Sequence, residues 1–525
     1  MQARRLRSQR PSPSAVTSLG GVLLPTSAAA FHIKTRSRDA YKVQTGEAGH
    51  FGIRRRNGCI RGAFNKILFT TPIIVLNLMP MLRDLARLSR RQFLQSSIGL
   101  AAASTLPAWY LEELLAQANA APTPTQAPSD QLRVALIGCG GMGTGDAKNA
   151  SRMAKIVALC DVDARHLARA KQTFPGAEGY SDFRKVMERK DVDAVICGTV
   201  DHWHTLVSIA AMRSGKDVYC EKPLTLTIDE GKKIVEAQRQ TGRILQTGTQ
   251  QRSSSHFRLA VDLIRNGRIG KVQRAEVWLP AGLRGGPFPS GPVPEGFDFD
   301  FWLGQTPKVE YVEERTHFSF RYWWEYSGGT ITDWGAHHND IVLWALEMDD
   351  SGPVSIEGKP LIEMIPGGYT ASSEYEITFT YPNDVVHVCR STTASEWNGE
   401  VKDPNGQLHG IRFTGSDGWI WVTRGEIKAS ERSLLTEKLP ESAKRVYVSN
   451  EHMDNFLECV KSRKPTICPA SVGHRSATVA HLGATAVRLA RKLQWDPVKE
   501  DFVNDAEASR WVSRPMRKPY DFSMI

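Results

Sequence analysis

Between residues 131 and 250, the chain alternates short apolar runs with longer amphipathic segments. The runs are rich in β-branched residues and predict strands, at 132–137, 155–161, 191–199, 216–220 and 243–249. The segments between them predict helices, and the helix at 228–242 opens with a capping box of Thr227 and Glu230. Strands that alternate with helices predict an α/β fold with a doubly wound parallel sheet.

The pattern changes after residue 250. Strand-like runs with alternating polarity now follow one another, at 271–280, 373–381, 385–392, 410–415 and 419–425. Two close pairs are joined by "PND" and "SDG", which suit hairpin turns, and a helical tail follows from 450 to 493. We predict a second, α+β domain over 251–525 with an open, largely antiparallel sheet. Because such a sheet can leave one face free for a partner sheet, we expect a homodimer or homotetramer.

Residues 81–121 have the three-part order of a secretory signal. The motif "SRRQFL" at 89–94 is a twin-arginine pattern, an apolar run follows at 98–106, and "ANA" at 118–120 is a small-residue cleavage site. The alternative is an ordinary basic amphipathic helix. We predict a twin-arginine signal peptide and export to the bacterial periplasm.

The position of the predicted signal also suggests how to interpret the residues before and after it. A signal begins near the N-terminus, and a start at Met79 or Met81 would place it there. Residues 1–80 would then be a spurious or disordered extension, and the Pro/Thr-rich residues 122–130 are predicted to be a linker. The apolar run at 67–79 is short and interrupted by Pro72, so we expect no membrane span.

Charge and cysteine usage narrow the classes of partner. The net charge of +11 is carried entirely by residues 1–80, which hold 13 Lys/Arg and 2 Asp/Glu, and the rest of the chain is neutral. A neutral body gives no reason to expect a nucleic-acid partner. The 8 cysteines include no CxxC pair, so the sequence indicates neither a zinc knuckle nor a disulfide framework.

The first strand leads directly into a glycine-rich loop, "GCGGMG" at 138–143. Glycines at this spacing allow a tight turn, close approach of the backbone to a pyrophosphate, and tight packing of helix on strand. The second strand ends at Asp161, where a carboxylate accepts hydrogen bonds from both ribose hydroxyls and repels a 2′-phosphate. With Asp163 close behind, the sequence favours NAD over NADP as the cofactor of a Rossmann domain at 131–250.

A second chemical cluster lies in "GGTITDWGAHHND". If residues from Thr332 onward are helical, Asp333 and His337 lie at i and i+4 on one face. A carboxylate that orients an imidazole raises its basicity and suits proton transfer. The alternative is a structural helix N-terminus with a satisfied histidine.

The motifs "GCGGMG", "CDVD", "TVDHWH", "CEKP" and "GGTITDWGAHHND" occur in this order. In this combination the chain resembles the Gfo/Idh/MocA family, the glucose–fructose oxidoreductase and inositol dehydrogenase group, and more closely its twin-arginine-exported members. The resemblance covers about residues 130–520. One departure is Val200, where the family more often has proline.

The resemblance implies specific site residues. The family's catalytic lysine maps to Lys222, and its catalytic Asp and His map to Asp333 and His337. The cofactor contacts that we infer are Gly138, Cys139, Gly140, Gly141, Met142, Gly143, Asp161, Val162, Thr199, His202, His204, Glu221, Lys222 and Pro223. The candidate substrate contacts are Arg252, Tyr322, Trp323, Trp324 and His338, although aromatic runs are as often core.

The expected reaction is oxidation of a secondary alcohol on a sugar. Hydride passes to NAD, His337 held by Asp333 takes the proton, and Lys222 lies near the substrate hydroxyl. Because an exported enzyme has no soluble NADH pool, we expect tightly bound, internally recycled cofactor. The alternatives are an NAD-dependent glycoside-cleaving enzyme, which acts by transient oxidation, and a non-catalytic sugar-binding protein. A metal enzyme that uses His202, His204, His337 and His338 lacks tight ligand spacing, so we expect no metal.

Overall fold

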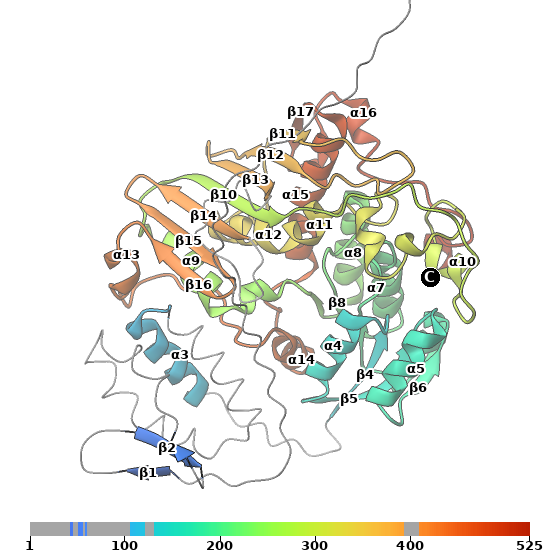
Figure 1. Cartoon of the computed structure of the whole chain (residues 1–525), viewed down its shortest axis with the longest axis horizontal. Helices are drawn as coiled ribbons and strands as arrows, with labels where there is room; N and C mark the ends of the chain where they lie inside the picture. Colours follow the sequence, from blue (N-terminus) through green and yellow to red (C-terminus); the bar gives the residue numbers. More distant parts are fainter. Residues whose placement is uncertain (1–42, 46–50, 56–57, 60–104, 121–130, 393–408) are drawn as a thin grey trace, which may run out of the picture. The chain divides into compact units, whose positions relative to one another are not determined.

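The structure is a computed structural model of the whole chain (Figure 1). It describes residues 43–45, 51–55, 58–59, 105–120, 131–392 and 409–525. The chain divides into two units, Met1–Arg90 and Arg91–Ile525. The described part of the first unit is an antiparallel sheet of β1 (Val43–Thr45), β2 (Phe51–Arg55) and β3 (Gly58–Cys59). The twin-arginine motif at 89–94 and the linker at 122–130 lie outside the described residues.

Six parallel strands form the predicted nucleotide-binding sheet. Their order, β6-β5-β4-β7-β8-β9, is that of a dinucleotide-binding Rossmann domain. The strands are β4 (Leu132–Ile137), β5 (Ala154–Cys160), β6 (Glu178–Tyr180), β7 (Ala194–Cys197), β8 (Asp217–Cys220) and β9 (Leu245–Thr247). Strands β7 and β8 are buried throughout, in keeping with the apolar character of β7 and of Val218–Cys220 in β8. The predicted doubly wound parallel sheet is confirmed.

Helices connect these strands, as the sequence predicts. They are α4 (Gly141–Ala150), α5 (Ala164–Thr173), α6 (Phe183–Glu188), α7 (His204–Arg213) and α8 (Ile228–Thr241). In the capping box of α8, the Thr227 hydroxyl accepts from Glu230 N at 3.3 Å, and the Glu230 carboxylate accepts from Thr227 N at 3.2 Å. The helix ends at Gly242, whose φ of 63° favours glycine.

The second sheet has nine strands in the order β16-β15-β14-β10-β13-β12-β11-β17-β18. They are β10 (Val272–Pro280), β11 (Ser355–Pro360), β12 (Tyr375–Thr380), β13 (Val386–Thr392), β14 (Gly410–Gly415), β15 (Trp419–Thr423), β16 (Glu426–Ala429), β17 (Lys492–Asp496) and β18 (Asp501–Phe502). The β10–β13 pair is parallel and the other pairs are antiparallel. The prediction of a largely antiparallel sheet is therefore confirmed.

One face of this sheet is covered by helices (Figure 1). Along β10 and β12, buried residues alternate with partly exposed ones, as expected for a sheet with one buried face. The covering helices are α9 (Ser255–Arg265), α12 (Gly335–Ala345) and α15 (Ala470–Leu489). Shorter elements of the same domain are α10 (Phe299–Leu303), α11 (Thr330–Asp333), α13 (Ser433–Thr436) and α16 (Ala506–Ser509).

A C-terminal helix returns to the first domain. Helix α14 (His452–Ser462) places Met453, Phe456 and Leu457 in one apolar cluster with Val134 and Leu159 of the parallel sheet. The boundary that we predicted at residue 250 therefore separates the two sheets but not their cores. In the part of the chain that the structure describes, no helix is both long and apolar enough to cross a membrane.

Helix α3 (Ala108–Ala120) consists of residues that the sequence assigns to the signal peptide. Trp109 and Tyr110 are 8% and 2% exposed and belong to the apolar core of the second domain. Trp109 Nε1 donates to the Leu435 carbonyl at 2.9 Å, and Arg258 Nε donates to the Tyr110 hydroxyl at 2.9 Å. The predicted boundary at residue 121 thus separates α3 from the domain on which it packs, and cleavage there would remove a packed element.

We expect that Tyr110→Ala lowers the thermal midpoint of unfolding by about 5 °C, because it removes a buried ring and the hydroxyl that accepts from Arg258 Nε. Thermal unfolding followed by circular dichroism measures this change. Leu115→Ala is the matched control, since Leu115 lies on the same helix and is 53% exposed. Equal midpoints for wild type and Tyr110→Ala would show that α3 does not contribute to the folded domain.

Candidate active site

A cavity of about 550 Å³ lies at the carboxyl ends of the parallel strands, where such sheets bind ligands. From the first domain, its lining includes nine of the predicted residues: Gly138, Gly140, Gly141, Met142, Asp161, Val162, Thr199, Glu221 and Lys222. The second domain supplies Phe297, Phe301, Trp302, His317, Phe318, Phe320 and Arg321. The cavity is therefore lined by residues from both domains.

The glycine-rich loop has the close backbone packing that its sequence predicts. Gly138 has a φ of 89°, and a Cβ there would meet the backbone of Gly198 at 2.5 Å. A Cβ on Gly143 would meet the Gly138 carbonyl oxygen at 2.2 Å, so this glycine permits tight packing of helix on strand. Helix α4 begins at Gly141 beside the cavity, where its first N–H groups suit a pyrophosphate.

Asp161 follows β5 at the edge of the same cavity. Its carboxylate accepts hydrogen bonds from Cys139 N at 2.7 Å and from Asp163 N at 2.8 Å. These bonds tie the acid to the glycine-rich loop and leave further acceptor capacity for ribose hydroxyls. The residues present therefore fit a dinucleotide whose ribose carries no phosphate.

Two histidines that the sequence analysis missed lie beside this acid. His166 Nδ1 is 3.6 Å from the Asp161 carboxylate, and His317 Nε2 is 3.3 Å from that of Asp163. The two imidazole rings lie 4.5 Å apart, so His317 brings the second domain to the ribose end of the cavity. No motif connects residues so far apart in the chain.

Lys222 and Asp333 form a close ion pair at the other end of the crevice. Lys222 Nζ lies 2.5 Å from Asp333 Oδ1, and Arg321 Nε lies 3.4 Å from the same oxygen. The Lys222 side chain is 9% exposed and that of Asp333 is 16% exposed. Burial raises the pKa of Asp333, but Lys222 and Arg321 together hold it below its ordinary value. The carboxylate is therefore ionised and bridges two cations.

His337 lies near this ion pair but does not bond to Asp333. The predicted continuous helix is interrupted at Trp334, between α11 and α12, and no hydrogen bond joins Asp333 to His337 among the described residues. The prediction that Asp333 holds His337 is wrong in this structure, because Lys222 and Arg321 engage the carboxylate instead. His337 Nδ1 has no hydrogen-bond partner in the described part of the chain.

Burial lowers the pKa of His337 well below 6.5, and the positive charges of Lys222 and Arg424 lower it further. The imidazole is therefore neutral near pH 7 and has a lone pair available to accept a proton. Glu221, which lines the cavity beside Lys222, has the opposite shift, because burial raises its pKa more than Lys222 lowers it. Lys222 and Glu221 thus line one end of the nucleotide cavity, and Asp333 and the neutral His337 lie close to Lys222 without lining it.

Comparison with known proteins identifies the family. Residues 132–249 match the model described as "Oxidoreductase family, NAD-binding Rossmann fold", and residues 285–522 match "Oxidoreductase family, C-terminal alpha/beta domain"; both are models of Gfo/Idh/MocA proteins. The chain belongs to the Gfo/Idh/MocA family. The resemblance that the sequence motifs indicate is confirmed at this level.

Curated members of the Gfo/Idh/MocA family match parts of the chain. An inositol 2-dehydrogenase from Klebsiella pneumoniae is 33% identical over 145 residues, which cover 26% of this chain and 43% of the relative. A glycosyl hydrolase family 109 protein from Shewanella pealeana is 29% identical over 211 residues, which cover 36% of this chain and 45% of the relative. The chain thus spans less than half the length of these curated relatives.

Among solved structures, the WlbA dehydrogenase from Bordetella pertussis, in complex with NADH and UDP-GlcNAcA, has the same fold. It aligns with a TM-score of 0.52 and 18% identity, over 70% of this chain and 99% of that protein. At this identity the likeness establishes the fold of the Gfo/Idh/MocA chain and no more.

The predicted substrate role of Arg252 is wrong, because its side chain is 1% exposed and lies outside the cavity lining. Arg252 Nε and Nη2 each donate to Asp340 at 2.8 Å, and Nη2 donates to Asp349 at 2.6 Å. Ser476 also donates to Asp340 at 2.7 Å. Arg252 therefore has a structural role: it forms buried ion pairs with two carboxylates and holds the elements that carry them together.

Of four further candidate substrate contacts, three are buried and Trp324 is partly buried. His338 is fully buried, and its Nε2 lies 3.0 Å from His409 Nδ1. Trp323 donates to the Glu314 carbonyl at 2.7 Å, and Trp324 is stacked between arginines of the C-terminal segment. Tyr322 is 8% exposed within an aromatic cluster. The structure places none of the four among the residues that line the cavity.

Five predicted cofactor residues lie behind the cavity wall rather than on it. The Cys139 side chain is buried, and Gly143 packs against the preceding strand. His202 Nε2 lies 2.8 Å from the Trp302 carbonyl, and His204 Nδ1 lies 2.7 Å from the Pro223 carbonyl. Pro223, whose carbonyl lies against His204, is the fifth predicted residue outside the lining. Direct contact of these five residues with the cofactor stays a prediction.

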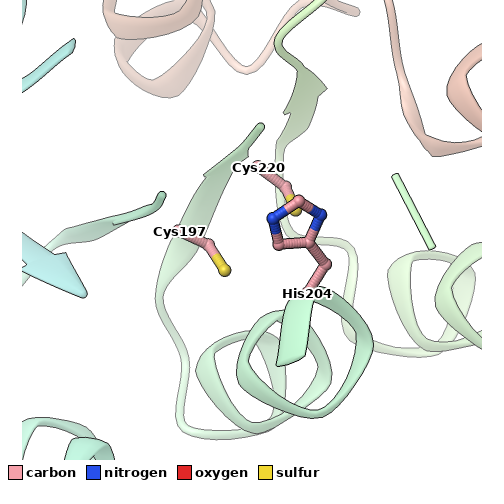
Figure 2. A group of neighbouring side chains, drawn as sticks. All are labelled: Cys197, His204 and Cys220. Atoms are coloured by element: carbon pink, nitrogen blue, oxygen red, sulfur yellow. The ribbon is translucent and has the colours of Figure 1, made fainter. Parts of the chain in front are cut away.

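Figure 2 shows three side chains that lie close together: Cys197 at the end of β7, Cys220 at the end of β8 and His204 at the start of α7. Burial raises the pKa of Cys197, but a hydrogen bond from Cys220 and the proximity of His204 outweigh it and lower the value to about 6. Zinc ligation would need a free imidazole nitrogen, whereas Nδ1 and Nε2 of His204 lie 2.7 and 3.2 Å from the Pro223 and Thr199 carbonyls. The absence of a metal stays a prediction.

Proposed function

We propose that this chain is an NAD-dependent oxidoreductase that acts on a secondary alcohol of a sugar or sugar derivative. The observation that carries the proposal is the buried Lys222–Asp333 pair, 2.5 Å apart, at one end of a cavity with a dinucleotide loop at the other. A buried charged pair in a cleft is a candidate for proton chemistry. Relatives named as dehydrogenases of inositol support an alcohol substrate with several hydroxyls.

The chemistry divides between cofactor and protein. Bound NAD would take the hydride from the carbinol carbon. The neutral His337 imidazole would take the hydroxyl proton, because its low pKa keeps it unprotonated. The Lys222 ammonium, held in place by Asp333, would hydrogen-bond to the substrate oxygen and stabilise the negative charge that develops there. Arg321 would keep Asp333 ionised.

The proposal includes tight retention of the cofactor. Residues from 297–321 of the second domain line the same cavity as the glycine-rich loop, so the cofactor would be enclosed between the domains. Export is also part of the proposal, because of the twin-arginine pattern at 89–94. A cofactor that stays bound would then be oxidised and reduced within one catalytic cycle.

We also propose that the open face of the nine-stranded sheet pairs with the same face of another copy, which gives a homodimer or homotetramer.

Asp161→Asn should reduce the preference for NAD over NADP by about tenfold or more. The carboxylate repels a 2′-phosphate, whereas the amide carries no charge and keeps one acceptor oxygen for one of the two backbone N–H groups, of Cys139 and Asp163, that the carboxylate binds. The dissociation constants of both nucleotides, measured on nucleotide-free protein, test this. Asp182→Asn removes a charge at the neighbouring strand end and is the control. An unchanged ratio would contradict the assignment of Asp161.

A second candidate function is glycoside cleavage by transient oxidation. The 29% identity to a protein named as a glycosyl hydrolase of family 109 favours it. Oxidation would acidify a neighbouring C–H bond, elimination would release the aglycone, and re-reduction would restore NAD. This cycle needs the same hydride acceptor and base, so the described residues serve both reactions.

Mass spectrometry of nucleotide released from native protein, joined to a screen of sugars and glycosides, tests the proposal. Bound NAD and a net oxidised sugar, formed with an added acceptor, would support the oxidoreductase. Free aglycone without net redox change would support glycoside cleavage. Protein without nucleotide and without turnover would favour a non-catalytic sugar-binding role and contradict both.

A further inference from the structure

Three side chains that can ligate a metal meet at the ribose end of the nucleotide cavity. Asp163 caps α5 and His166 lies in the first turn of that helix, whereas His317 belongs to the second domain. All three line the cavity, and each offers a ligand atom within 4.8 Å of those of the other two. None of them takes part in the mechanism proposed above.

The spacing of these atoms suits one small metal ion. His317 Nε2 lies 3.3 Å from Asp163 Oδ2, and the rings of His166 and His317 lie 4.5 Å apart. Two ligands of a tetrahedral zinc ion, each about 2.0 Å from the metal, are separated by about 3.3 Å. Among the described residues, the Asp163 carboxylate accepts its hydrogen bonds from Arg165 and not from His317. The close nitrogen and oxygen therefore keep a lone pair each for an ion.

Asp163 and His317 are also in the protonation states that bind metals. Burial raises the pKa of Asp163, but hydrogen bonds from Arg165 outweigh it and hold the value at about 2. Burial lowers the pKa of His317, and His166 lowers it further. Metal ligation needs an ionised carboxylate and a neutral imidazole, which are the forms that these two groups have near pH 7.

Arg165 orients the carboxylate without cancelling the charge of the cluster. Its backbone N–H and Nε donate to Asp163 Oδ1 at 2.8 and 3.0 Å, and its Nη2 donates to Oδ2 at 2.7 Å. Carboxylates that ligate metals are themselves hydrogen-bonded in this way. Asp161, whose carboxylate lies 3.6 Å from His166 Nδ1, adds a second negative charge. Two carboxylates thus face one guanidinium, and the remaining negative charge attracts a cation.

The backbone holds His317 opposite Asp163. His317 has a φ of 52°, a left-handed conformation that is uncommon for residues other than glycine and that concentrates at functional sites. Its ring packs on Phe297, with centroids 5.4 Å apart, and Phe297 forms an antiparallel bridge with Asp163. Next to this bridge, Ala164 N donates to the Gly296 carbonyl at 2.9 Å. Backbone pairing between the two domains therefore maintains the spacing of the ligands.

We propose that Asp163, His166 and His317 bind one divalent transition-metal ion, zinc above all, that ties the two domains together at the rim of the nucleotide cavity. Two imidazoles and a carboxylate are a ligand set that zinc takes in proteins, with a fourth position open to water. The set shares no residue with the cluster in Figure 2 or with the histidines considered for a metal enzyme. The ion has no place in hydride transfer, so the prediction that the reaction needs no metal is unchanged.

An ion at this position would affect the nucleotide through the cavity rim. Because His317 comes from the second domain and the other two ligands come from the first, the rim can open here only after the ion loses a ligand. Bound nucleotide should therefore leave more slowly when the site holds zinc. This consequence rests on the proposed function, whereas binding of the ion does not.

Titration of chelator-treated native protein with zinc, in competition with a chromogenic zinc indicator, tests the site. His317→Asn and His166→Ala each remove one ligand and should weaken zinc binding about a hundredfold or more. Asparagine replaces His317 because it tolerates a left-handed backbone. The control is Asp182→Asn, which removes a negative charge at the neighbouring strand end and keeps a residue type that can cap α6.

The control should bind zinc as tightly as the wild type does. Cobalt in place of zinc should give the visible absorption bands of a four-coordinate ion in the wild type and the control, and not in the two histidine variants. Equal zinc affinity in the wild type and both histidine variants, or no zinc binding by the wild type, would overturn the site.

The rate of nucleotide release tests the tie between the domains. Released NAD can be followed continuously when an added dehydrogenase with an excess of its alcohol converts it to NADH. Zinc should slow release from the wild type and the control about tenfold, a chelator should reverse this, and the histidine variants should not respond. Zinc that binds without slowing release would contradict the tie. Native protein without nucleotide would instead contradict the proposed function, and the zinc titration would still decide the metal site.

Discussion

Lys222→Ala is expected to reduce turnover about a thousandfold or more while the protein still carries NAD. Of the two described cations that line the cavity and pair with Asp333, the Lys222 ammonium lies closer to its Oδ1, at 2.5 Å against 3.4 Å for Arg321. Its removal leaves the developing alkoxide without a preorganised donor in a low-dielectric site. The dinucleotide loop and Asp161 lie on other strands, so nucleotide binding should persist. Turnover and nucleotide content of the same preparation measure both effects.

Lys216→Ala is the matched control for this substitution. Lys216 is also buried, at 2% exposure, but lies just before β8, at the opposite end of the strand that Lys222 follows. Its Nζ donates to the Met187 carbonyl at 3.0 Å, far from the cavity lining. This variant should lose stability and keep its turnover per folded chain. Wild-type turnover in Lys222→Ala would remove that lysine from the mechanism.

His337→Gln is expected to lower turnover by about a hundredfold or more and to remove the acid limb of the pH profile. The base must be unprotonated to act. Because burial, Lys222 and Arg424 lower its pKa, protonation requires a pH below 6.5, the ordinary value for histidine. The wild-type activity should therefore be maintained as pH falls through 6.5 and be lost only at lower pH. The dependence of kcat/KM on pH measures this directly.

The control is His338→Gln, which alters the neighbouring buried histidine whose Nε2 contacts His409. That change should affect stability more than the position of the acid limb. An acid limb above pH 6.5 in the wild type, or the same limb in His337→Gln, would show that another group is the base.

The strand and loop pattern of the first domain could be predicted from the sequence because each signal is local. The apolar run at 132–137, the glycines at 138–143 and the acid at 161 lie within one βαβ unit, where spacing determines position. The hairpin-turn sequences "PND" and "SDG", together with the alternation of apolar and polar residues along the strands, likewise predicted the largely antiparallel sheet of the second domain. Where local chemistry and tertiary packing agree, sequence reasoning is sufficient.

The errors arose where the role of a polar residue depends on a distant partner. Arg252 follows a strand of the parallel sheet, as a substrate contact would, yet Asp340 and Asp349 neutralise it in the interior. Asp333 has the i, i+4 spacing for His337, but Lys222, 111 residues away, takes its carboxylate. The aromatic run at 322–324 is equally ambiguous, since stacking surfaces and core residues have the same composition.

The role of helix α3 also depends on partners that are distant in the sequence. A small-residue motif at 118–120 fits a cleavage site, and only the tertiary contacts of Trp109 and Tyr110 reveal that the preceding residues pack into a domain core. The signal-peptide assignment stays a prediction. If export occurs, the packing of α3 favours a processing site before residue 105.

The central claim is that this protein carries NAD and reduces it with a sugar alcohol through Lys222. The most direct measurement is the absorbance of the bound nucleotide when native protein is mixed rapidly with the sugars and glycosides of the screen. The account predicts that an NADH band forms in wild-type protein and is about a thousandfold slower in Lys222→Ala. Native protein without nucleotide, or bound NAD that no sugar or glycoside reduces even transiently, would contradict it.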